Sequence, residues 1–126
     1  MDTISFDQFS AIDIRIGTVI KADVPEWSHW VVRLEIEFGE EIGKKVCFSG
    51  IMKFFKPEDL VGKQFPFVVN LAPKTIGPEK ELSEAMMIMA TPAPKATAGE
   101  AVPSEEETPT VLFKLQKKVL NGTKVR

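Results

Sequence analysis

Alternation of apolar and polar residues predicts the first strand of this chain between Ile12 and Ile20. The isoleucines at alternate positions share one face, whereas Asp13 and Arg15 share the other, because successive side chains of a strand point to opposite faces. Gly17 stands at a position where a side chain would obstruct the bending of a closing sheet. The segment is therefore interpreted as the first strand of a barrel, with a charged pair on its outer face.

A second, longer alternation predicts a strand over residues 30–38. Gly39 and Gly43 bracket a hairpin connection, after which residues 44–49 return as a third strand. The three strands are expected to form an antiparallel meander. The inward face of the second strand is expected to carry Trp30, Val32, Leu34, Ile36 and Phe38.

Helical signals are short. A helix is expected to begin after Ser5, because Ser5 and Gln8 have the spacing of a capping box. Phe6 and Phe9 would give this helix an apolar edge that could cover one end of the barrel. Residues 57–59 are expected to form a turn or one helical turn, with proline near its start.

The remaining strands are predicted from apolar runs. Residues 65–71 form one, which Pro66 confines to a sheet edge or a bulge. The run 86–90 is short enough for a strand buried on both faces. Residues 111–115 resume a strand, and Asn121–Gly122 is a turn before a last short strand. The residues predicted to share one closed core are Ile14, Ile16, Trp30 or Val32, Leu34, Ile36, Val46 and Val68.

Composition sets the size and class of the protein. The chain has 126 residues, of which 44% are hydrophobic, and this length supports one core and one domain over residues 1–126. No apolar run approaches the span of a bilayer, and no basic segment precedes an apolar one at the N-terminus, so neither membrane insertion nor secretion is expected. The single Cys47 cannot form an internal disulfide; it suits the cytoplasm, the expected location, and other compartments nearly as well.

Charge is unevenly distributed along the chain. The net charge is −2, but residues 91–110 hold four acids and one base. This segment is rich in Ala, Pro, Thr and Glu and has too few large apolar groups to fold alone, so it is interpreted as a mobile acidic loop. The rest of the chain holds 15 basic and 14 acidic residues. A nucleic-acid site would therefore depend on local clusters of cations.

The residues that enzymes use are scarce. The chain has one histidine, His29, and one cysteine, with no glycine-rich phosphate loop and no serine in a nucleophile elbow. A nucleophilic triad or a metal site therefore lacks its components, and no spacing singles out a catalytic pair among the acids. We expect a protein that is not an enzyme and has no cofactor or metal.

Binding to nucleic acid has better candidates. Lys53 and Lys56 flank Phe55, an arrangement that combines phosphate contact with base stacking. Arg33, on the outer face of the second strand, and Lys74 are further candidates for phosphate contacts. Each cation alone is more often a solvated surface charge, and a phenylalanine more often packs in the core.

Several short blocks in a fixed order resemble the tRNA-binding domain family. They are Asp13–Gly17, Pro57–Lys63, Asn70–Lys74, Ser83–Met86 and Asn121–Arg126. The pattern is similar to stand-alone tRNA-binding proteins and CsaA-type chaperones, whose domain is also appended to methionyl-tRNA synthetases. The resemblance implies an all-β, five-stranded Greek-key barrel of the oligonucleotide/oligosaccharide-binding (OB) fold, with a short N-terminal helix. It also implies a homodimer built from the flanking segments 5–11 and 111–126.

The same resemblance implies site residues. Ser83 and Met86 match the family's Ser-x-Gly-Met motif, which contacts RNA, and Asn70 and Lys74 match its Asn-Leu-x-Pro-Arg/Lys block. Residues 24–29 look closer to the CsaA branch. The first interpretation is a non-catalytic homodimer that binds structured RNA of the tRNA type. The alternative is a CsaA-like protein-export chaperone that binds unfolded polypeptides.

Overall fold

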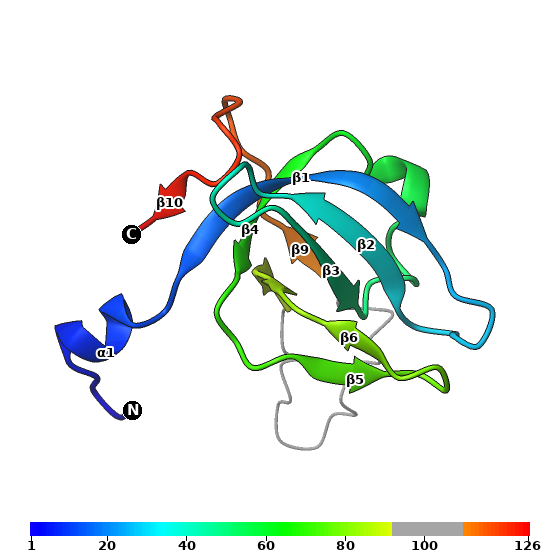
Figure 1. Ribbon diagram of the computed structural model, residues 1–126, viewed down its shortest axis with the longest axis horizontal. Helices are drawn as coiled ribbons and strands as arrows, with labels where there is room; N and C mark the ends of the chain where they lie inside the picture. The colour runs from blue at the N-terminus through cyan, green and yellow to red at the C-terminus, as the bar shows by residue number, and fades with distance from the viewer. Residues whose placement is uncertain (92–109) are drawn as a thin grey trace, which may run out of the picture.

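The computed structural model describes residues 1–91 and 110–126, so the acidic loop predicted at 91–110 lies almost entirely outside the described residues. The described part contains short helices and ten β-strands (Figure 1). Their bounds are α1 Phe6–Ser10, β1 Ile14–Asp23, β2 Val32–Glu37, β3 Lys44–Ser49, the 3-10 helix η1 Pro57–Asp59, β4 Gln64–Val68, β5 Lys74–Ile76, β6 Glu81–Ser83, β7 Met86–Met87, β8 Met89–Ala90, β9 Val111–Leu112 and β10 Lys124–Val125.

Five strands form the barrel wall in the hydrogen-bonded order β3-β2-β1-β4-β7, and every neighbouring pair is antiparallel. The wall closes where the chain between β6 and β7 meets β3, since the Glu84 N–H donates to the Val46 carbonyl at 2.8 Å. β5 and β6 form a separate hairpin at one end of the molecule (Figure 1). The predicted all-β OB-type barrel is therefore confirmed.

The first strand has the features that its sequence predicts. A side chain at Gly17 would collide with Ile36 and would lie 2.6 Å from the Phe38 ring, so only glycine lets β1 and β2 approach this closely. On the outer face, Arg15 Nε lies 2.7 Å from Asp13 Oδ1. The strand runs later than predicted, from Ile14, which leaves Ile12 outside it and 42% exposed.

The core fills the barrel interior. Ile16, Val32, Leu34, Ile36 and Val68 are buried, as predicted. The other buried apolar residues of the main cluster include Val19, Phe38, Ile51, Leu60, Phe65, Phe67 and Met87. Because the cluster also includes Cys47 of β3, it draws on every wall strand and on the chain around η1, so the barrel encloses one core.

Two core predictions and the predicted start of the second strand need correction. Ile14 is only half-buried, since it lies at the open end of β1. Val46 is also half-buried, and Cys47 is the buried apolar residue of β3, because Cys47 stands directly opposite the inward-facing Leu34. Trp30 is 56% exposed, and β2 begins only at Val32.

The end of the preceding loop explains the position of Trp30. The Ser28 hydroxyl accepts hydrogen bonds from the N–H groups of Trp30, at 3.2 Å, and Val31, at 2.9 Å. Both residues are thereby held in a turn around a buried serine, and the alternation predicted for residues 30–38 holds only from Val32.

Pro66 was expected at a sheet edge or a bulge, and the pairing agrees with this on one side, because the ladder between β4 and β7 includes only Phe67 and Val68. β4 pairs with β1 on one side and with β7 on the other. The ladder does not need a donor here, because Ile16, opposite Pro66, donates its own N–H to Thr123. The Pro66 carbonyl still accepts from the Ile88 N–H at 3.0 Å. Proline is thus admitted where β1 needs no donor from it and where the ladder with β7 has ended.

The apolar run 86–90 does not form one strand buried on both faces. It divides at Ile88 into β7, paired with β4, and β8, paired with β9. Met87 is buried but Met86 is 53% exposed, because β7 is the last strand of the wall and only one of its faces meets the core. The exposed Met86 belongs to the candidate site.

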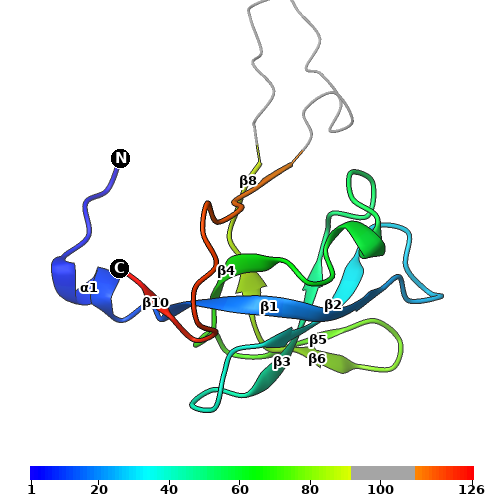
Figure 2. The same cartoon turned by 90° about the horizontal axis from the view of Figure 1, so that it is seen from above.

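The N-terminal helix is confirmed with its capping box. The Ser5 hydroxyl accepts from the Gln8 N–H at 3.1 Å, and the Gln8 side chain accepts from the Ser5 N–H at 2.8 Å. The helix does not cover the barrel end, however: Phe6 is 78% exposed and Phe9 41%. Figures 1 and 2 show α1 standing away from the barrel, on the side where β10 lies.

Two turns after the third strand were predicted correctly, and a third was not predicted. Residues 57–59 form η1, and Gly122 has the positive φ of +88° that the predicted Asn-Gly turn requires. The β5–β6 hairpin was not predicted. Its turn depends on positive φ angles at Gly77 and Lys80, and the lysine gives no sequence signal for that conformation.

Candidate nucleic-acid interface

The β5–β6 hairpin is attached to the barrel by Arg33 of β2. Arg33 Nε and Nη2 lie 2.9 and 2.7 Å from the Glu81 carboxylate on β6, and Nη1 lies 2.9 Å from Glu35. These hydrogen bonds raise the pKa of Arg33 and lower the pKa of Glu81. Arg33, which was predicted to contact phosphate, is thus already hydrogen-bonded to two carboxylates of the chain itself.

Aromatic rings also pack against the β5–β6 hairpin. The Trp27 ring packs against Gly77, where a Cβ atom would lie 2.6 Å from Trp27 Cε2. The Trp27 ring centre also lies 6.1 Å from that of Phe48 and 6.3 Å from that of Trp30. The hairpin is therefore fixed to the barrel by an ion-paired cluster and by a ring contact that only glycine permits.

Ser83 and Met86 lie beside Phe48 of β3. The Ser83 hydroxyl accepts a hydrogen bond from the Phe48 N–H at 3.2 Å. A groove of about 380 Å³ lies next to Phe48 and is lined by Phe48, Ser49, Gly50 and residues 86–89. Met86 presents a flexible thioether at this groove, and the Ser83 hydrogen bond holds the end of β6, three residues before Met86, against β3.

Lys74 lies directly across the hairpin from Ser83 and is exposed. The structure therefore places a cation, a hydroxyl and an exposed thioether along one path from β5 through β6 to β7. Asn70 has a different surrounding: its side chain accepts from the Asp13 N–H at 2.9 Å and donates to the Ala11 carbonyl at 2.7 Å. Its amide thus ties the segment before β1 to the end of β4.

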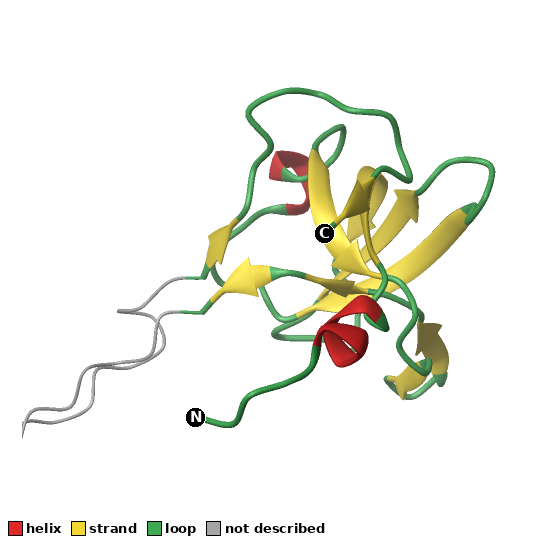
Figure 3. Cartoon of the chain, turned by 90° about the vertical axis from the view of Figure 1, so that its left-hand side faces the viewer, coloured by secondary structure: helices red, strands yellow, loops and turns green. Residues whose placement is uncertain are grey.

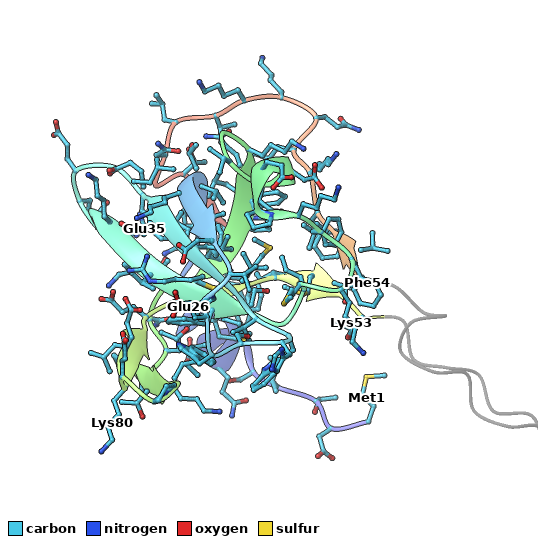
Figure 4. The ribbon with its side chains drawn as sticks, turned by 90° about the vertical axis from the view of Figure 1, so that its right-hand side faces the viewer. Met1, Glu26, Glu35, Lys53, Phe54 and Lys80 are labelled. Atoms are coloured by element: carbon cyan, nitrogen blue, oxygen red, sulfur yellow. The ribbon has the colours of Figure 1, made fainter. Side chains whose placement is uncertain are left out.

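Lys53, Phe55 and Lys56 lie in the link between β3 and η1. Both lysines are exposed, whereas Phe55 is half-buried against the core. Figure 4 shows Lys53 next to Phe54 and on the opposite side of the view from Lys80, which lies in the β5–β6 turn. The predicted cations thus fall into two groups, one on this link and one at the hairpin.

Two features near this interface were not anticipated from the sequence. Trp30, predicted in the core, is an exposed ring beside Trp27. Ser28, two residues earlier, is the signal that could have identified the turn that exposes it. The hairpin that positions Lys74 and Ser83 is the second feature.

The described residues show no arrangement suited to metal binding, since no group of three or more His, Cys, Asp or Glu converges in them. Burial raises the pKa of the Cys47 thiol to about 11, so this sulfur is a poor nucleophile. No helix in the described ranges is long and apolar enough to span a bilayer.

The family model "Putative tRNA binding domain" matches residues 14–124. The methionine–tRNA ligase of Methanothrix thermoacetophila is 45% identical over 73 residues, which are 58% of this chain, and that of Methanococcoides burtonii is 40% identical over 72 residues. The chain spans about one tenth of the length of these two relatives.

Solved structures match over nearly the whole chain. The MetRS-related protein of Pyrococcus horikoshii has a TM-score of 0.81 at 27% identity, covering 100% of both chains. The chaperone CsaA of Bacillus anthracis has a TM-score of 0.75 at 33% identity, covering 99% of this chain and 100% of its own. The CsaA chaperone of Picrophilus torridus has a TM-score of 0.77 at 25% identity, covering 98% and 100%.

Proposed function

The chain belongs to the tRNA-binding domain family, and from this we propose that it is a non-catalytic, homodimeric module that binds structured RNA of the tRNA type. The observation that carries the proposal is the path formed by Lys74, Ser83 and Met86. The Lys74 cation is paired across the hairpin with Ser83, and the exposed Met86 thioether follows three residues after Ser83, at the start of β7. Such a set can contact a phosphate, a sugar and a base of one RNA segment.

The other predicted residues take different roles in this proposal. Lys53 and Lys56 would contact further phosphates from the link before η1, where Phe55 packs against the core and shapes the backbone. Arg33 would hold the hairpin through Glu81. Asn70 would fix the segment before β1, because both ends of its amide are already bonded to backbone groups there.

We place this function in the cytoplasm, with residues 1–126 acting as one binding domain that needs no cofactor. Cys47 is a buried free thiol, which suits a reducing compartment. The proposal that the domain has no catalytic role of its own follows from the scarcity of nucleophiles and bases in the sequence.

The homodimer would form through α1 and β10. Phe6, Phe9, Ile12 and Val125 line one hollow of about 290 Å³ and are all exposed in the single chain. Figure 3 shows α1 on the face turned to the viewer, with the C-terminus above it. An apolar patch of two phenylalanines on so small a domain is better explained by burial against a second copy than by solvation.

The dimer proposal predicts that the molecule sediments at twice the chain mass. Replacing Phe6 and Phe9 together with glutamate should give a folded monomer, because the charges would oppose burial while both side chains are exposed in the single chain. Analytical ultracentrifugation at micromolar concentration measures both states. A wild-type monomer that does not associate at higher concentration would reject the proposal.

A second candidate function is binding of unfolded polypeptide. The groove lined by Phe48 and residues 86–89 is mostly apolar and rich in methionine, a side chain that adapts to varied apolar partners. The likeness to CsaA chaperones adds weight to this candidate. The groove adjoins Ser83 and Met86, so RNA and polypeptide would compete for overlapping surfaces.

A salt series separates the two functions. Binding of tRNA should weaken steeply between 50 and 200 mM salt, because each phosphate contact releases counterions, whereas an apolar peptide contact should weaken little or strengthen. The measurement is fluorescence anisotropy with labelled tRNA and, in parallel, a reduced unfolded protein. If tRNA does not bind at 50 mM salt while the polypeptide does, the chaperone function is the correct one.

A further inference from the structure

A groove lined by lysines lies at the end of the barrel away from the β5–β6 hairpin. It has a volume of about 300 Å³ and is lined by Gly62, Lys63, Gln64, Lys114, Leu115 and Lys118. Figure 1 shows its two components at the top of the view: the link from η1 to β4, and the segment that precedes β10. The hairpin with Lys74 and Ser83 lies at the bottom of the same view.

Gln64 joins the two components. Its Nε2 donates to the Val119 carbonyl at 2.7 Å, and its Oε1 accepts from the Val119 N–H at 3.0 Å. The same amide nitrogen lies 3.1 Å from Asn121 Oδ1. A single side chain at the start of β4 thus pins a segment 55 residues later in the sequence, and this contact brings Lys114 and Lys118 next to Lys63.

The backbone of Lys63 is equally well fixed. Its N–H donates to the Leu60 carbonyl at 3.2 Å, and its carbonyl accepts from the Val19 N–H at 3.0 Å. Gly62 has a φ of +84°, which only a residue without a Cβ atom adopts at little cost, and its N–H donates to the Val19 carbonyl. Lys63 therefore projects from a backbone that the barrel fixes, and Lys118 directly precedes Val119, which Gln64 holds.

The charge of this groove is unbalanced. Within residues 1–91 and 110–126, no acidic side chain lines it and none of its three lysines forms an ion pair. The cleft around Arg33 is the opposite case, since Asp23, Glu26, Glu35, Glu79 and Glu81 line it together with Lys21 and Arg33. Ammonium groups gathered without counter-charges repel one another, and a bound polyanion would relieve that repulsion.

We propose that this groove binds the phosphate backbone of the same RNA, as a second contact distinct from the Lys74–Met86 path. The proposal rests on the proposed RNA-binding function. A second copy of this chain is a poorer occupant, because a two-fold axis through the groove would bring six ammonium groups together. The fixed backbone favours phosphates held in the geometry of a folded RNA, since little ordering is required of the protein.

The test compares two charge-matched variants in the full chain. Lys63→Gln with Lys118→Gln removes one cation from each component of the groove, and Lys21→Gln with Lys44→Gln removes two exposed cations elsewhere. The groove variant should bind tRNA about tenfold more weakly at 100 mM salt. Its slope of log affinity against log salt should fall by about 2, because each lost phosphate contact removes about 0.9. The control should change affinity less than about twofold.

Acetylation footprinting gives a measurement that needs no variant. Bound tRNA should protect Lys63, Lys114 and Lys118 from acetic anhydride, as read by mass spectrometry, and should leave Lys21 and Lys44 reactive. Suppose that wild-type protein binds tRNA, that the groove variant binds it with the same affinity as the control variant, and that Lys63, Lys114 and Lys118 of the wild type stay reactive. The second contact is then rejected while the proposed function stands. If wild-type protein binds no tRNA, the proposed function itself fails.

Discussion

Replacing Leu34 with alanine should lower the free energy of unfolding by about 2 to 5 kcal/mol. Leu34 is 0% exposed and lies in β2, between β1 and β3, with Cys47 directly opposite. Neighbouring strands cannot collapse into the resulting cavity without breaking their own ladders, so the upper half of that range is expected. Because domains of this size are stable by about 5 to 15 kcal/mol, the loss is a large part of the total.

Urea unfolding followed by circular dichroism measures this loss, at one fixed protein concentration so that dimer formation does not alter the comparison. Leu71→Ala is the matched control, because it removes the same atoms from a residue that is 48% exposed. The control should change stability by less than about 0.5 kcal/mol. An equally small loss at Leu34 would mean that the inner face of β2 has been assigned backwards.

The strands that follow strict alternation were predictable from the sequence. In the first two strands, Ile16, Leu34 and Ile36 face the core as expected, and the glycines of the hairpin that follows placed residues 44–49, which match β3 at both ends. The reason is that a two-residue period can bury only one set of side chains, so the pattern fixes the face. The capping box at Ser5 was predictable for a similar reason, since both of its bonds join residues three apart.

The failures occur where distant contacts decide the outcome. Val46 and Cys47 are both apolar, so only the pairing of Cys47 with Leu34 determines which of them is buried. Trp30 lies outside the core because Ser28 holds a turn there. Trp30 stands two residues before Val32 and so fits the alternation, which is why the pattern did not indicate the turn.

The residues of the candidate site were likewise predictable where short sequence blocks carry them and unpredictable where distant contacts decide their role. Ser83 and Met86 were located through short blocks that resemble the family, and the structure brings them into one path with Lys74. Arg33 was chosen as an outward-facing cation, but its partner Glu81 lies 48 residues away, and the sequence alone cannot pair them. The groove around Lys63 was missed because Gln64 assembles it across a comparable separation.

Combined replacement of Lys53, Lys56 and Lys74 with alanine should weaken tRNA binding by about ten- to a hundredfold at 100 mM salt and lower the salt slope by about 3. All three side chains are exposed, so the fold should survive their removal. Thermal unfolding and sedimentation confirm that the variant is folded and retains the assembly state of the wild type. The expected change in slope follows from the loss of about 0.9 counterions for each phosphate contact.

Replacing Ser83 and Met86 with alanine should have a different signature. These side chains carry no charge, so affinity should fall at every salt concentration while the slope stays that of the wild type. The Ser83 hydroxyl also accepts a hydrogen bond from the Phe48 N–H, so Met86→Ala alone, at a 53% exposed position, separates loss of RNA contact from loss of local structure.

If the triple lysine variant, folded and assembled as the wild type, binds tRNA with unchanged affinity and slope, the proposed phosphate contacts of Lys53, Lys56 and Lys74 are wrong. Loss of polypeptide binding on Met86→Ala would then favour the chaperone function.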